Sequence, residues 1–280
     1  MATALSRSRG VLPGFGLTLG ITLFYTAIII ALPIFALVLK SASLGPAEFW
    51  AIVTSRRAVA TYQVTLGAAA GATVFNAVFG LLLAWVLVRY RFPGRRVLDA
   101  LVDLPFALPT AVAGIALANL LAPTGWLGAP LKDLGIKVAY TPLGIAVAMA
   151  FTSIPFVVRT VQPVLEDLSR EAEEAAHSLG APDRAIFLRV IMPAILPAFL
   201  AGAALAFARS LGEFGGVIFI AGNRPFQTEI TALLTFIRLE EFDYPAAAAI
   251  ATMILVCAFV MLLLINILQF WAARHSGRGG

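Results

Sequence analysis

The sequence predicts an all-α membrane protein: one transmembrane domain over residues 1–280 that forms a polytopic bundle of six transmembrane helices. Two observations indicate this fold class. Hydrophobic residues make up 60% of the chain and charged residues only 12%, about half of the roughly 25% that is typical of soluble domains. The mean hydropathy is +0.93, and a soluble fold of this length could not cover its surface with so few charges.

Six long apolar runs provide the transmembrane helices, because a helix needs about 20 apolar residues to cross the hydrocarbon layer. The runs cover residues 15–39, 61–88, 100–121, 141–161, 194–220 and 246–270. The first run is too long for the apolar part of a signal peptide, so we interpret it as an uncleaved span.

The distribution of Lys and Arg predicts the orientation of these helices. Of the 20 basic residues, twelve fall on one side of the membrane, seven fall on the other, and Arg209 lies inside a span. Loops on the cytoplasmic side carry an excess of Lys and Arg, so we expect both termini in the cytoplasm. The basic segment 89–96 fits this arrangement beside membrane lipid and does not indicate a nucleic acid as partner.

Three ionisable residues within the predicted spans are candidates for a translocation path or gate. Arg209 and Glu213 are spaced i, i+4, so they can pair on one side of a helix. An unpaired Arg near the bilayer centre costs about 2.5–3.5 kcal/mol, and neutralisation by Glu213 would by itself explain the pair. Because intramembrane ions are often functional, a role in the path is an equal alternative. Asp103 is the third candidate, about a turn inside the third span.

Glycine spacing predicts where helices approach one another. Gly67 and Gly71 are separated by three residues, as are Gly212 and Gly216. Small residues at this spacing let membrane helices pack closely, so we expect packing contacts at both pairs.

The loop between the fourth and fifth spans, residues 162–193, is the only long cytoplasmic loop. Apolar residues recur at helical spacing on one face, at Leu165, Leu168, Ala172, Ala175, Ala176 and Leu179. Gly180 is expected to end this helix, and Pro182 to begin a second short one. Acids predominate on the loop and anionic lipid repels them, so a protein partner with basic residues fits it better than the membrane surface.

The same loop carries a motif that points to a family. It reads Glu174-Ala175-Ala176, three residues, Gly180, nine residues, then Val190-Ile191-Met192-Pro193. This resembles the EAA loop of ABC importer permeases, which reads Glu-Ala-Ala, three residues, Gly, nine residues, Ile-x-Leu-Pro. Val190 and Met192 are conservative departures. The resemblance implies a type I ABC importer permease fold, in which Glu174, Ala175, Ala176, Gly180 and Pro193 couple the chain to a separate ATPase.

Other segments resemble the oxyanion branch of this family. Residues 104–114 and 208–215 are similar to permeases for sulfate, thiosulfate, molybdate and tungstate, and residues 219–230 and 239–244 are most similar to the T-type sulfate/thiosulfate permease. The resemblance implies ATP-driven import across a bacterial inner membrane. Its partners would be a second permease subunit in a heterodimer, an ATPase dimer that binds ATP and Mg²⁺, and a periplasmic sulfate-binding protein docked on the outer loops around residues 126–140 and 223–244. A homodimeric molybdate or tungstate permease is the alternative.

The sequence gives the chain no catalytic role of its own. A P-loop requires Gly-Lys followed by Ser or Thr, and the only lysines, Lys40, Lys132 and Lys137, do not follow glycine. We find neither a Ser-His-Asp set nor metal ligands at a recognisable spacing, so we expect no catalytic residue, metal or cofactor in this chain. A secondary transporter driven by an ion gradient is an alternative that leaves the acidic loop without a partner. An intramembrane enzyme would lack a catalytic set.

Overall fold

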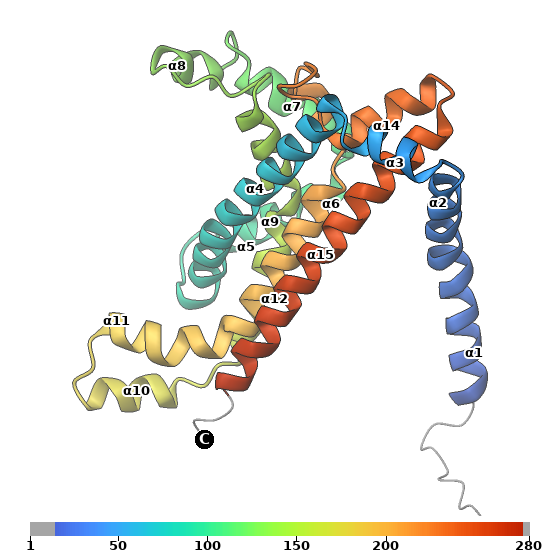
Figure 1. The fold of residues 1–280 in the computed structure, drawn as a ribbon. Coiled ribbons are helices and arrows are strands. Elements are labelled where there is room, and N and C mark those ends of the chain that lie inside the picture. The colour runs from blue at the N-terminus through green and yellow to red at the C-terminus, as the bar shows by residue number, and fades with distance from the viewer. Residues whose placement is uncertain (1–14, 277–280) are drawn as a thin grey trace, which may run out of the picture.

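The structure is a computed structural model that describes residues 15–276, with side chains as far as residue 267 (Figure 1). All regular secondary structure in these residues is helical, which confirms the predicted all-α fold class. The predicted cytoplasmic position of the two termini concerns segments that lie outside the described residues.

Five helical segments in the described part of the chain are long and apolar enough to cross a membrane. They correspond to the first, second, fourth, fifth and sixth predicted spans, and cover Phe15–Ala42, Arg56–Arg89, Pro142–Asp167, Asp183–Leu211 and Tyr244–Ile267. The first comprises α1 (Phe15–Thr26), η1 (Ala27–Ala31) and α2 (Leu32–Ala42). The second is α4 (Arg56–Arg89), the fourth is α9 (Pro142–Asp167), and the sixth belongs to α15 (Tyr244–Ser276).

The predicted third span, residues 100–121, is not one helix. It is divided into α5 (Arg95–Val102), α6 (Leu104–Ala107) and α7 (Thr110–Leu121). The breaks fall at Asp103, two residues before Pro105, and at Leu108 and Pro109, because proline has no N–H to donate and its ring clashes with the preceding turn. The 12 residues of α7 extend for only about 18 Å, against a hydrocarbon thickness of about 30 Å. The third segment is therefore a broken one, and residues 15–276 do not contain six full-length membrane helices.

The fifth span is displaced relative to the prediction of residues 194–220. Its helical segment begins with α11 (Asp183–Ile186) and the π-helical turn η2 (Phe187–Ile191), and continues as α12 (Met192–Leu211). The π-helical turn lies directly before Pro193, whose missing N–H cannot join a regular ladder. A break at residues 212–216 separates α12 from α13 (Val217–Ile220).

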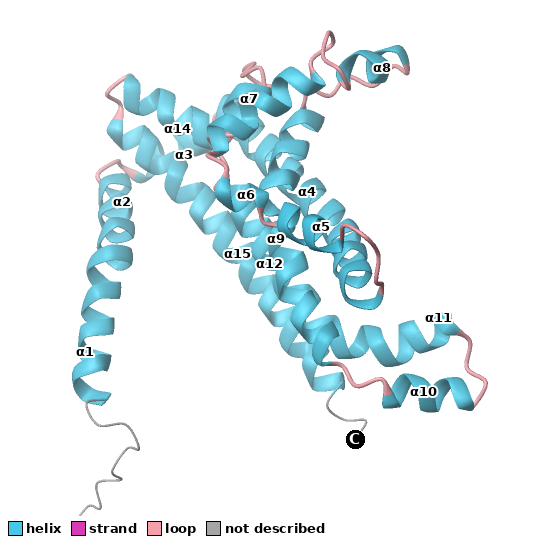
Figure 2. Ribbon diagram, turned by 180° about the vertical axis from the view of Figure 1, so that it is seen from behind, coloured by secondary structure: helices cyan, strands magenta, loops and turns pink. Residues whose placement is uncertain are grey.

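Short helices lie at both ends of the long ones (Figures 1 and 2). At one end are α3 (Pro46–Val53), α8 (Gly128–Asp133) and α14 (Thr231–Glu240). At the opposite end, where α1 begins and α15 ends, α10 (Glu171–Ser178) and α11 extend sideways from the bundle. The loop between the fourth and fifth spans therefore forms a hairpin outside the bundle, as the sequence predicts.

The core lies where α4, α9 and α12 pack against one another. A buried polar network joins these helices: the Asn76 Nδ2 atom donates to the Ser153 Oγ atom at 2.8 Å, and the Ser210 Oγ atom donates to the same oxygen at 3.1 Å. By contrast, α1 and η1 contain no buried residue. The rigid part of the molecule is thus the three-helix core, with the polar contacts fixing its register.

The two predicted glycine contacts have different outcomes. A Cβ atom on Gly114 of α7 would lie 2.2 Å from the Gly216 carbonyl oxygen, so close approach at residues 212–216 is confirmed. A Cβ atom on Gly67 or Gly71 would meet no atom of this chain within 4 Å. The expectation of packing at Gly67 and Gly71 is therefore wrong within the chain. The close approach on α4 is instead at Gly80, where a Cβ atom would lie 2.9 Å from the Val157 side chain of α9.

We predict that Gly80→Leu destabilises the chain and that Gly71→Leu does not. The added side chain at position 80 would push α4 from α9, and overpacking of this kind costs about 1–3 kcal/mol, whereas position 71 has free space. The measurement is the temperature at which half of the chain, purified in detergent, remains monodisperse after heating. Equal midpoints for the two variants would contradict the packing described here.

Candidate functional site

The acidic hairpin at residues 162–193 is built from α10, a glycine turn and α11. Gly180 has a φ of +80°, a left-handed conformation that glycine adopts without strain. The Gly180 N–H donates to the His177 carbonyl at 2.9 Å, and the Ala181 N–H donates to the Ala176 carbonyl at 3.1 Å. These bonds close the C-terminus of α10 in the way that the sequence predicts for a C′ glycine.

Most of α10 is free to meet a partner. The helix contains no buried residue among those described, and Glu174 and Ala175 are exposed. Leu179 is 88% exposed, which is a high value for a large apolar side chain, and it lies beside the turn at Gly180. Pro193 is instead in the first turn of α12, and Ala176 packs against the core cluster around α4 and η2. The motif residues thus divide into an exposed set and a set that anchors the hairpin.

One cluster ties the hairpin to the second span. Arg89, the last residue of α4, forms an ion pair with Glu173 of α10, and their side chains are only 11% and 20% exposed. The Arg89 guanidinium also lies over the Trp85 ring at 5.2 Å, and Trp85 packs edge-on against Phe187 of η2 at 5.4 Å. A groove of about 1030 Å³ lies beside this cluster, between α4 and the hairpin.

Arg89 and Glu173 were not predicted from the sequence to form a site. The available signal was the i, i+4 spacing of Trp85 and Arg89, which places a ring and a guanidinium on one face of the helix end. Glu173 lies 84 positions away in sequence, so spacing could not indicate it as the partner.

Asp103 is held in an ion-pair network with α9. The Arg159 Nε atom donates to its Oδ1 atom at 2.8 Å, and the Nη2 atom donates to its Oδ2 atom at 2.7 Å. The Nη1 atom of the same guanidinium donates to Asp99 Oδ1 at 2.6 Å. This network fastens the junction between α5 and α6 to α9, so the carboxylate of Asp103 already has a cationic partner.

Arg209 and Glu213 pair as their spacing predicts. The Arg209 Nη2 atom lies 2.7 Å from the Glu213 Oε2 atom, and the Glu213 side chain is only 1% exposed. The other carboxylate oxygen, Oε1, accepts a hydrogen bond from the Gly216 N–H at 2.7 Å. Glu213 therefore caps the N–H of Gly216, the N-cap residue of α13, which matters because this carboxylate is buried away from water.

The two breaks in the membrane helices meet at this pair. The backbone of Gly216 lies against α7 at Gly114, and a Cβ atom on Gly215 would lie 2.4 Å from the Thr110 Oγ1 atom at the start of α7. The broken third segment and the end of α12 are therefore in direct contact. The Arg209 guanidinium, with a 30% exposed side chain, is beside this junction and reaches the surface of the chain.

A second buried carboxylate, Glu229, lies at the end of the molecule that is opposite the acidic hairpin. The Arg57 Nε and Nη2 atoms donate to Glu229 at 2.8 and 2.6 Å, and the Glu229 side chain is 1% exposed. The Arg224 Nη2 atom donates to the Tyr140 carbonyl at 3.0 Å. These bonds fix the loops around residues 126–140 and 223–244 against the start of α4.

Broken membrane helices around a buried ion pair, with an exposed acidic hairpin at one end, define a membrane permease that works with other subunits. The comparison of families agrees with this class. Residues 76–276 match the model of the binding-protein-dependent transport system inner membrane component, and the chain belongs to this family.

Relatives within the family have a more specific description. The chain is 59% identical over 262 residues to the sulfate transport system permease protein CysT of Salmonella typhimurium, covering 94% of this chain and 95% of the relative. It is 51% identical over 256 residues to the CysT protein of Synechocystis sp., covering 91% and 90%. A solved bacterial ABC transporter involved in the import of the acidic polysaccharide alginate has the same fold, with a TM-score of 0.74, 17% identity, and coverage of 91% of this chain and 94% of that chain.

We predict that loss of the pair between Arg89 and Glu173 loosens the hairpin. A hydrogen bond to a charged group contributes about 1.5–3 kcal/mol, so Arg89→Ala should speed cleavage of the hairpin by trypsin, after Arg170 or Arg184, by about tenfold to hundredfold. The exchanged pair Arg89→Glu with Glu173→Arg should recover part of the protection. Arg238→Ala, which removes an ion pair at the other end of the molecule, is the control. Unchanged cleavage in Arg89→Ala would show that this pair does not hold the hairpin.

We also predict that Arg209→Ala is more harmful than Glu213→Gln. The first variant leaves a buried carboxylate without its cation, which costs about 3–5 kcal/mol for a buried pair. The second keeps an oxygen that can accept from the Gly216 N–H. The measurement is the thermal midpoint in detergent, with Arg209→Lys as a variant that retains the charge. Equal midpoints for Arg209→Ala and Glu213→Gln would overturn the assignment.

Proposed function

We propose that this chain is the permease subunit of an ATP-driven importer that moves sulfate or thiosulfate across a bacterial inner membrane. The observation that carries the proposal is the 59% identity over 94% of the chain to a protein described as a sulfate transport permease. The retained acidic hairpin with its Glu174-Ala175-Ala176 motif supports the same conclusion. The hairpin and both termini lie on the cytoplasmic side in this proposal, in agreement with the excess of basic residues there.

The exposed part of the hairpin is the docking surface for the ATPase in this proposal. Glu174 and Ala175 contact the ATPase, and Gly180 sets the turn that presents Leu179 beside them. Ala176 and Pro193 anchor the surface to the bundle, so a movement of the docked ATPase reaches α12 through η2. The exposed acid and the apolar side chain match a groove with basic edges and an apolar floor. ATP and Mg²⁺ bind to the ATPase, and this chain needs no cofactor.

The substrate anion passes beside Arg209. Sulfate carries two negative charges and is very costly to strip of water in a low-dielectric bundle, so a free carboxylate on the route would repel it. Arg209 neutralises Glu213, and its partly exposed guanidinium supplies positive charge at the junction of the two helix breaks. Asp103, held by Arg159 on the cytoplasmic side, acts in this proposal as part of a gate that moves with α5 and α9.

The partners follow from the incomplete path in one chain. A second, related permease subunit completes the path, and two ATPase subunits drive it. A periplasmic binding protein delivers the anion to the surface formed by the loops around residues 126–140 and 223–244. A heterodimer is the form that the resemblance to the T-type permease implies, and a homodimer is the form expected if the substrate is molybdate or tungstate.

The experiment that tests the function is uptake of radiolabelled sulfate by vesicles that contain the assembled permeases, ATPase and binding protein. We expect uptake that requires ATP, competes with thiosulfate and is little affected by equimolar molybdate. Uptake that continues without the ATPase would instead favour a secondary transporter. Uptake blocked by molybdate, with little inhibition by thiosulfate, would favour the molybdate alternative.

We predict that Glu174→Lys weakens binding of the ATPase and abolishes ATP-dependent uptake, because it reverses a charge at the centre of the docking surface. Membrane insertion should not change, since the side chain is exposed. Co-purification of the ATPase with the tagged permease measures the effect, and Glu48→Lys, an exposed acid of α3 at the opposite end of the molecule, is the matched control. Retention of the ATPase at the wild-type level by Glu174→Lys would contradict the docking assignment.

A further inference from the structure

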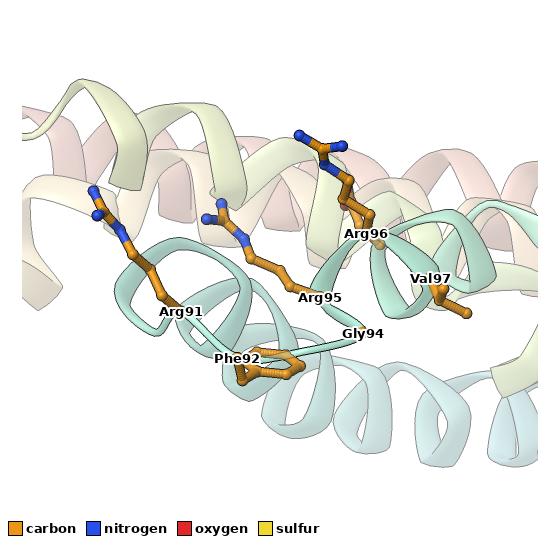
Figure 3. A pocket seen from close by; sticks show the side chains of 7 residues that line it. Arg91, Phe92, Gly94, Arg95, Arg96 and Val97 are labelled. Carbon is orange, nitrogen blue, oxygen red and sulfur yellow. The ribbon is translucent and has the colours of Figure 1, made fainter.

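A pocket of about 620 Å³ lies where α4 ends and α5 begins, and four of its seven lining residues are charged. The lining residues are Arg91, Phe92, Gly94, Arg95, Arg96, Val97 and Asp99. Figure 3 shows the side chains of the three arginines leaving the chain on one side, while Phe92 lies on the other. Three cationic groups therefore share one small region of the surface.

The positive charge of this pocket has no counter-ion in the described part of the chain. None of the three arginines takes part in an ion pair there, unlike Arg89 at the end of the same helix. The one acid in the lining, Asp99, already accepts from the Arg159 Nη1 atom at 2.6 Å. Its carboxylate is therefore directed to α9 and leaves the arginine cluster uncompensated.

The local backbone adds to the positive potential. Gly94 has a φ of +87° and occupies the N-cap position of α5, where it offers no side-chain acceptor, and the first turn holds Arg95 and Arg96 but no acid. Cations at the N-terminus of a helix oppose its dipole, so this sequence raises the electrostatic cost of the turn. An anion bound among the three arginines would offset both the repulsion between their charges and the repulsion between these charges and the positive end of the α5 dipole.

We propose that the pocket binds the phosphate of an acidic phospholipid headgroup. Its position at the end of a membrane-spanning helix is the level at which headgroups lie. The exposed apolar side chains of Val97 and Leu101, 63% and 53% exposed, continue from the pocket along α5 and offer a surface for the acyl chains. Guanidinium groups bind phosphate oxygens through two parallel hydrogen bonds, and the pocket is larger than one inorganic anion requires.

Lipid binding here has a consequence for the fold. Arg95 and Arg96 lie in the first turn of α5, and Arg159 joins the other end of this helix to α9 through Asp99 and Asp103. A bound headgroup therefore stabilises the first half of the broken third segment at the membrane surface. This site is independent of the transported anion, so its failure would leave the proposed sulfate transport unaffected.

The test compares the full-length chain with the triple variant Arg91→Gln, Arg95→Gln, Arg96→Gln. Both are purified in detergent, titrated with phosphatidylglycerol or phosphatidylcholine, and analysed by native mass spectrometry for the number of lipids retained. We expect the wild type to retain one more phosphatidylglycerol than the triple variant. Each arginine near the surface contributes about a fivefold effect, so the affinity of this site should fall on the order of 100-fold in the triple variant.

The matched control removes the same number of charges elsewhere, through Lys40→Gln, Lys132→Gln and Lys137→Gln, three exposed lysines that do not line the pocket. Normal phosphatidylglycerol retention in this control, with loss only in the pocket variant, supports the site. Equal loss in both triple variants would reduce the effect to bulk charge and overturn the proposal. Two further results together would overturn the proposal: release of the bound lipid by millimolar sulfate, and retention of phosphatidylcholine at the same level as phosphatidylglycerol. They would assign the pocket to a free oxyanion.

Discussion

The attachment of the acidic hairpin to the second span depends on the ion pair between Arg89 and Glu173. The bundle of α4, α9 and α12 is rigid, because its helices interlock at Gly80 and share the buried contacts of Asn76. Within the acidic hairpin, α11 continues through η2 into α12, whereas α10 has no buried residue of its own. The ion pair, sheltered between Trp85 and α10, joins α10 to the end of the second span. A force applied to the exposed face of α10 is thereby applied to α4.

The second constraint is the satisfaction of backbone groups in lipid. A helix frees C=O groups at its C-terminal end and N–H groups at its N-terminal end, and these groups need protein partners where water cannot reach them. This chain stops one helix at Leu211 and starts another at Thr110, and it brings the two breaks together through the close approach of Gly114 and Gly216. Glu213 accepts one of the freed N–H groups and is itself neutralised by Arg209. The same arrangement leaves a cationic group beside a junction of short segments that can shift relative to one another.

Much of the fold could be predicted from the sequence, because a bilayer allows few solutions. The apolar runs predicted five of the long helices, and the i, i+4 spacing predicted the pair of Arg209 with Glu213. The division of the third segment was not predicted, although Pro105 and Pro109 were its visible cause, since prolines also occur inside unbroken membrane helices such as α9.

The contacts between distant segments could not be read from the sequence at all. Arg159 binds Asp103 across 56 positions, and Arg89 binds Glu173 across 84. Only the packing of the helices decides such pairs. The sequence predicted the turn of the hairpin at Gly180 but not the way in which the hairpin is attached to the bundle. The apolar face expected from Ala172 to Leu179 is largely exposed. The ion pair of Glu173 and the packing of Ala176 hold α10 instead.

The most direct test of the central claim is the distance between α10 and α4 during transport. Spin labels on Val74→Cys and Ser178→Cys, in a chain with Cys257→Ala, would be measured by double electron–electron resonance in the assembled complex. About 22 Å of helix separates residue 74 from the end of α4, which suits the method. If the ion pair joins the hairpin to α4, the distance distribution is the same without nucleotide and in the ATP-trapped state, while Arg89→Ala broadens it. A shift of the wild-type distance between the two states would contradict the account.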